Sequence, residues 1–181
     1  MKKILPFAVL LAASPAFAHP GHAVESLQAG LLHPLSGLDH LLMLLGSGIL
    51  AALTGRSLAL PLATIAALAF GALLGQSLSS LPGMEAMILL SLLVAGIAML
   101  TQRARGWLAA ILPVLALAHG WAHGVEAGEG TFAGFAAGFL LASSTLLAAG
   151  YAAGVQLRRI PALQKLAGTG LLASAAVLIA G

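Results

Sequence analysis

The sequence predicts an all-α membrane protein, a six-helix transmembrane bundle that follows a cleaved signal peptide. Composition is the first observation behind this prediction. Hydrophobic residues make up 60% of the 181 residues, charged residues make up 7%, and the mean hydropathy is +1.05. These values lie far outside the usual makeup of soluble domains. The second observation is that apolar runs with the length of membrane spans recur along the chain, after a short apolar segment with a cleavage pattern.

The first segment is predicted to be a secretory signal peptide, residues 1–18. Two lysines precede an apolar stretch over 4–13, and residues 15–18, with the sequence PAFA, end in an A-x-A pattern. The apolar stretch is shorter than the ~20 residues that a span needs, so we favour cleavage after Ala18 over an uncleaved first helix. The mature chain, 19–181, has no polar linker that would divide it, and we expect one transmembrane permease domain.

Six helices are expected in the mature chain because six apolar runs alternate with short polar or glycine-containing breaks. The predicted spans are 36–53, 57–79, 84–101, 106–126, 130–155 and 161–180. Glycines spaced four residues apart recur within them and predict close contacts between helices. These pairs are Gly71 and Gly75, Gly134 and Gly138, and Gly150 and Gly154.

The orientation of the bundle follows from its basic residues. If the mature N-terminus is exported, successive spans alternate in direction, and the connections 54–56, 102–105 and 156–160 face the cytoplasm. All basic residues of the mature chain lie in or beside these three connections, as the positive-inside rule requires. They are Arg56, Arg103, Arg105, Arg158, Arg159 and Lys165. We therefore predict a multi-pass protein of the bacterial inner membrane with both mature termini outside.

All six histidines lie in three short stretches of sequence. These are HPGH at 19–22, HPLSGLDH at 33–40 and HGWAHGVE at 119–126. The second stretch opens the first predicted span and the third closes the fourth, so the topology places both near the outer surface. Because His33 precedes Pro34, we expect it to avoid helical geometry at the entrance to the span.

The second and third stretches predict a metal site within the membrane. In a helix, His119, His123 and Glu126 share one face. An aspartate at a helix centre costs on the order of 2.5–3.5 kcal/mol in insertion measurements, so Asp39 should face the interior and have a partner. Imidazole and carboxylate groups bind Ni²⁺, Co²⁺ and Zn²⁺ well, and the chain has no cysteine to supply thiolates. The predicted metal-binding residues are His33, Asp39, His40, His119, His123 and Glu126.

Two further features bear on this interpretation. Gly120 and Gly124 follow the two histidines of the third stretch, and they leave room either for an ion or for a neighbouring helix. The polar cluster itself also fits a proton relay or a structural hydrogen-bond network.

The first histidine stretch predicts a capture site for metal at the outer surface. Cleavage after Ala18 makes His19 the first residue, so its α-amine and imidazole lie close to the imidazole of His22. Two or three nitrogen ligands then share one segment ahead of the membrane site. An ordinary terminus without a metal role is the alternative.

At these residues the chain resembles the HupE/UreJ family of hydrogenase and urease accessory proteins, which are nickel or cobalt permeases. The resemblance rests on H-x5-D-H at 33–40 and on H-G-x-A-H-G-x-E at 119–126. It extends to the signal peptide, the HPGH stretch and the six spans. Ala118 stands where the family often has phenylalanine. The resemblance implies uptake of a divalent transition metal through the six residues named above.

The expected function is therefore a secondary permease or facilitator for Ni²⁺, or for Co²⁺, rather than an enzyme. No phosphate-binding loop is present and no cofactor is expected, because the metal ion is the cargo. The rival interpretation is an intramembrane zinc-dependent hydrolase that uses the same ligands. The expected partners are the metal ion and the lipid bilayer. Nucleic acid is not among them, because topology explains the basic residues, and the oligomeric state, including a homo-oligomer, is left open.

Overall fold

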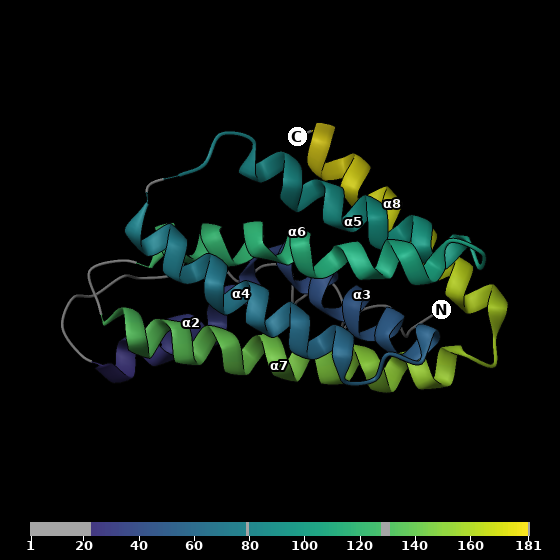
Figure 1. Cartoon of the computed structure of the whole chain (residues 1–181), viewed down its shortest axis with the longest axis horizontal. Helices are drawn as coiled ribbons and strands as arrows, with labels where there is room; N and C mark the ends of the chain where they lie inside the picture. Colours follow the sequence, from purple (N-terminus) through teal and green to yellow (C-terminus); the bar gives the residue numbers. More distant parts are fainter. Residues whose placement is uncertain (1–22, 79, 128–130, 181) are drawn as a thin grey trace, which may run out of the picture.

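The computed structural model describes residues 23–78, 80–127 and 131–180, and over these residues the chain folds into seven helices with no strand (Figure 1). The helices are α2 (Ala23–Ser36), α3 (Leu38–Thr54), α4 (Ala59–Ser77), α5 (Met84–Leu100), α6 (Arg105–Glu126), α7 (Phe132–Leu157) and α8 (Pro161–Ala180). The predicted signal peptide and the HPGH stretch with His19 and His22 lie outside the described residues.

The helices α3 to α8 follow the six predicted spans, with no boundary displaced by more than two residues. Four of them, α4, α6, α7 and α8, are long and apolar enough to cross a membrane. The bent pair α2 and α3 passes the same test as one unit, and α5, with 17 residues, is a shorter apolar helix. These apolar helices indicate a multi-pass membrane protein, and the count of six crossings stays a prediction.

The helix α2 was not predicted, and it corrects the expectation for His33. We expected Pro34 to keep His33 out of helical geometry, but both residues lie within the last turn of α2. Because Pro34 has no N–H, α2 lacks one backbone bond in its last turn, and the helix ends two residues later. The helix stops at Ser36, and α3 continues after an 80° bend at Gly37.

Close packing on α7 compensates for the proline in α2. A Cβ atom at Gly30 would overlap the carbonyl oxygen of Phe135, and one at Gly138 would overlap that of Leu27. The two backbones therefore approach each other as closely as glycine allows, which is how helices gain van der Waals contact in lipid. This tertiary packing outweighs the local preference of the His33–Pro34 pair.

Glycine also joins α4 to α6, the helix that carries the third histidine stretch. A Cβ atom at Gly120 would overlap the Leu68 carbonyl oxygen, and one at Gly124 would overlap that of Ala72. From the other side, Gly71 and Gly75 meet the backbone of α6 at Leu117 and Trp121. Of the two interpretations of Gly120 and Gly124, contact with a neighbouring helix is the one that the structure shows.

Of the remaining helices, α5 and α3 pack against α6, and α2, α7 and α8 pack on their other neighbours. In Figure 1, α5 and α8 lie side by side along the upper edge, and α7 runs along the lower edge with α2 and α3 packed against it. Large apolar side chains cover the outside of this bundle, including Leu58, Val114 and Trp107, which are each more than 60% exposed. An apolar exterior of this kind suits a lipid environment.

Arginines secure the end of the bundle where α6 begins. The Arg105 guanidinium donates to the carbonyls of Ala98 and Met99, at 3.1 and 3.2 Å, near the end of α5. Arg158 likewise donates to the carbonyl of Ala52 near the end of α3. Cations stabilise helix C-termini in this way.

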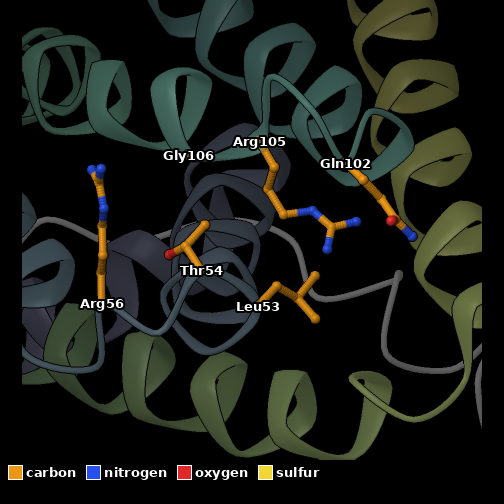
Figure 2. Close-up of a pocket in the computed structure, with 6 residues that line it drawn as sticks. All are labelled: Leu53, Thr54, Arg56, Gln102, Arg105 and Gly106. Carbon is orange, nitrogen blue, oxygen red and sulfur yellow. The ribbon is translucent and has the colours of Figure 1, made fainter.

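A cavity of about 360 Å³ adjoins Arg105. Its lining, shown in Figure 2, is Leu53, Thr54, Arg56, Gln102, Arg105 and Gly106. The 22 residues of α6 separate this basic end of the bundle from Glu126 by roughly 33 Å. The basic cavity and the histidines of α6 thus lie toward opposite ends of one helix.

The glycine contact between α4 and α6 predicts a sharp difference between two substitutions. Gly120→Ala places a methyl group against the Leu68 backbone, and we expect a loss of stability of about 1–3 kcal/mol or more, with lower abundance in the membrane. Gly170→Ala in α8 is the matched control, because a Cβ atom there meets nothing within 4 Å. Abundance and thermal unfolding in detergent measure both effects, and equal behaviour of the two variants contradicts the assigned packing.

Candidate metal centre

The bend between α2 and α3 brings two histidines against the end of α6. His33, in the last turn of α2, places its Nε2 atom 2.9 Å from Oε2 of Glu126, a residue 93 positions away in the chain. Its ring lies 4.7 Å from that of His123, measured between centroids. His40, in the first turn of α3, has its ring centroid 4.3 Å from that of His123 and 4.6 Å from that of His119.

The four imidazoles thus form a continuous row across the contact between the helices. The row runs from His33 to His123, His40 and His119, and the spacing of four residues on α6 puts its two histidines on the same face. The predicted topology placed the second and third histidine stretches near the same surface of the membrane, and this contact is consistent with that prediction.

The outer part of the row is the group with the best metal-binding geometry. One ligand atom from each of His33, His123 and Glu126 lies within 4.8 Å of the others. Two ligands of one ion at 2.0–2.2 Å are at most roughly 4.4 Å apart, so small side-chain rotations can close this group around an ion. The side chains of His33 and Glu126 are 31% and 53% exposed, which makes the group accessible from one side.

The inner part of the row begins at His123 and continues to His40 and His119, and its ring nitrogens are buried and unused. His119 and His123 are fully buried, at 0% and 1% exposure. Five buried side-chain polar atoms lack a hydrogen-bond partner in the described part of the chain, and four of them are ring nitrogens: His40 Nε2, His119 Nδ1, and both nitrogens of His123. Buried polar groups nearly always have a partner, so this concentration of unpaired nitrogens indicates a binding site.

Asp39 contacts the site through His40. Its Oδ1 atom accepts hydrogen bonds from the backbone N–H and from Nδ1 of His40, both at 2.8 Å. This bond leaves Nε2 of His40 as the free nitrogen. A carboxylate that holds the second nitrogen of a histidine is a common arrangement around metal ligands. Asp39 also lines, with Glu85 and Ile88, a cavity of about 190 Å³.

The comparisons with known proteins agree with these motifs. The family model described as "HupE / UreJ protein" matches residues 7–178. Protein HupE of Rhizobium leguminosarum bv. viciae is 35% identical over 144 residues, which cover 77% of this chain and 75% of that protein. The chain belongs to the HupE/UreJ family. No solved structure matches it.

In this HupE/UreJ protein the structure brings together all six residues that the sequence singled out. Four imidazoles form the row, Glu126 bonds to His33, and Asp39 bonds to His40. Their role as metal ligands stays a prediction. Their placement gives the two carboxylates different surroundings: Glu126 is in the accessible group, whereas Asp39 is bonded to a neighbouring imidazole.

The sequence analysis did not assign three residues that lie beside the row. Ser91 on α5 places its Oγ atom 2.9 Å from Nε2 of His119. Phe139 on α7 packs against His123 with a centroid separation of 4.1 Å, and Glu85 lines the cavity beside Asp39. Serine and phenylalanine are unremarkable in apolar helices, so no local pattern marks these two positions. Glu85 carried a signal as an acidic residue at a helix end, but the sequence alone did not connect it to Asp39.

The unpaired nitrogens predict that metal stabilises the folded protein. Ni²⁺ at 100 times its dissociation constant should raise the free energy of unfolding by about 2.7 kcal/mol, seen as a higher melting temperature in detergent. His123→Ala should remove most of this increase, because His123 contacts both parts of the row. Thr64→Ala is the control, since the buried Thr64 hydroxyl bonds to the Leu60 carbonyl on α4. An equal Ni²⁺ response in the His123 and Thr64 variants contradicts a site at the row.

Proposed function

We propose that this protein is a permease or facilitator that moves Ni²⁺ or Co²⁺ across the inner membrane into the cytoplasm. The observation that supports it most is the row of four imidazoles, whose buried nitrogens lack partners within an apolar bundle. Family membership supports the choice of cargo, because the resemblance at the two motifs implies nickel or cobalt permeases. Imidazole nitrogens bind both ions, and Zn²⁺ as well, so the ligands do not select among them.

The row suggests a path with two successive stations. The accessible group of His33, His123 and Glu126 is the first station, where an ion exchanges water for protein ligands. The second is the pair formed by the half-buried His40 and the fully buried His119. His123 contacts histidines of both stations, so it can hold the ion while the other ligands exchange. A stepwise exchange of this kind avoids a bare ion in the apolar interior.

The membrane potential is sufficient to drive entry. A divalent cation gains about 4.6 kcal/mol per 100 mV of inside-negative potential, so inward movement needs no nucleotide. Binding must still be weak enough for release on the cytoplasmic side. Protonation of imidazole and carboxylate competes with metal and provides one means of release.

The topology belongs to the same proposal. Residues 1–18 are a signal peptide and 19–181 a six-span domain with both mature termini outside. Under this arrangement the row of imidazoles lies in the outer half of the bundle, and Arg56, Arg105 and Arg158 lie at the cytoplasmic end. His19 and His22 then serve as a capture site ahead of the first station. The alternative of a zinc-dependent hydrolase gains no support from the comparisons.

Uptake of radiolabelled Ni²⁺ and Co²⁺ at low concentration tests this function in cells with and without the protein. Asp39→Ala, His40→Ala and His123→Ala should each reduce uptake to the level of cells that lack the protein, because each interrupts the row. Their abundance in the membrane should stay near that of the wild type, and Thr64→Ala should transport normally.

Full uptake by any two of the three variants contradicts a shared metal path. Loss of uptake that merely follows loss of protein would assign these residues a structural role instead.

A further inference from the structure

We propose that Ser91 is a positioning residue that fixes the tautomer of His119, so that Nδ1 is the nitrogen offered to the metal. This inference deepens the proposed function and rests on it for its biological meaning. Its structural content is separate, because it concerns which nitrogen of a buried ring carries the hydrogen.

The hydrogen bonds of Ser91 determine the direction of the contact. Ser91 is fully buried on α5, and its hydroxyl donates to the Ile88 carbonyl at 2.6 Å. A serine hydroxyl has one hydrogen, so its oxygen can only accept at the second contact, 2.9 Å from Nε2 of His119. Nε2 of His119 therefore carries the hydrogen.

The lone pair of the ring is then at Nδ1. A neutral imidazole protonated at Nε2 has its acceptor at Nδ1. In His119 this atom is buried and has no hydrogen-bond partner. The ring is thus held with its metal-binding nitrogen free, in contact with the ring of His40 at 4.6 Å between centroids.

His40 is held in the opposite sense. Asp39 accepts from Nδ1 of His40, which leaves Nε2 as the unpartnered nitrogen. The two rings of the inner pair thus differ in the nitrogen they leave free, and each difference has its own hydrogen-bonding residue. An apolar residue at position 91 would leave the Ile88 carbonyl as the remaining acceptor beside the His119 ring. The Nε2-protonated tautomer would then be held less firmly, which lowers the population ready to bind an ion.

Three serines of the described residues are fully buried, Ser47, Ser91 and Ser143, and of these Ser91 is the one whose hydroxyl bonds to a histidine of the row. The hydroxyl of Ser47 bonds to the sulfur of Met43 at 3.5 Å, and the Ser143 hydroxyl has no partner. Ser47 is also fully buried, so Ser47→Ala removes a serine hydroxyl from the interior without touching the row. It is the matched control for Ser91→Ala.

Nitrogen NMR of purified protein labelled with ¹⁵N-histidine tests the tautomer directly, without metal. The wild type should show His119, assigned by its loss in His119→Asn, protonated at Nε2. Ser91→Ala should give a mixture of tautomers, whereas Ser47→Ala and the conservative variant Ser91→Thr should keep the wild-type signal. Protonation of His119 at Nδ1 in the wild type, or an unchanged signal in Ser91→Ala, overturns the inference.

Titration of the same proteins with Ni²⁺ alone measures the consequence. Loss of a residue that orients a metal ligand costs about 10–100-fold in affinity, and we expect a loss in this range for Ser91→Ala. Ser91→Thr and Ser47→Ala should bind as the wild type does. Equal affinity in Ser91→Ala and Ser47→Ala overturns the positioning role. Wild-type protein that binds Ni²⁺ but does not transport it would instead contradict the proposed function and leave the Ser91 result intact.

Discussion

Unpaired imidazole nitrogens inside an apolar bundle are the constraint on which the rest of the structure depends. Leaving one buried polar group without a partner costs about 1–3 kcal/mol, and four such nitrogens lie on His40, His119 and His123. A packed interior has no reason to gather them unless something binds there. A metal ion can accept an electron pair from one nitrogen of each of these rings, so its binding offsets much of the cost that the metal-free fold carries.

The packing of the helices forms a frame that holds these nitrogens in place without hydrogen-bond partners. The 80° bend between α2 and α3 lets His33 and His40 approach His123 from two helices. The glycines of α4 and α6 lock α6 in place by direct backbone contact, and this fixes the depth of both its histidines. Arg105 and Arg158 bind helix ends at the far side of the bundle. A frame secured at both ends holds the imidazoles of His119 and His123 apart from water.

Hydropathy and motif spacing predicted much of this arrangement. The helix positions followed from apolar runs, because lipid demands continuous apolar helices, and the two motifs pointed to one site. The helix around Pro34 was missed because local backbone preference yielded to the packing of Gly30 and Gly138 between α2 and α7. Ser91 was missed because a serine in an apolar helix has no distinguishing pattern, and its contact with His119 exists only once α5 packs on α6. The sequence equally could not tell that Asp39 would bond to its own neighbour His40.

X-ray absorption at the nickel edge tests the central claim most directly, with purified protein loaded with one equivalent of Ni²⁺. The imidazole row predicts nitrogen or oxygen ligands with the outer-shell scattering of at least two histidine rings, and His123→Ala should lower that ring count. A spectrum that shows oxygen ligands without imidazole scattering, or one that His123→Ala leaves unchanged, would contradict metal binding at the row.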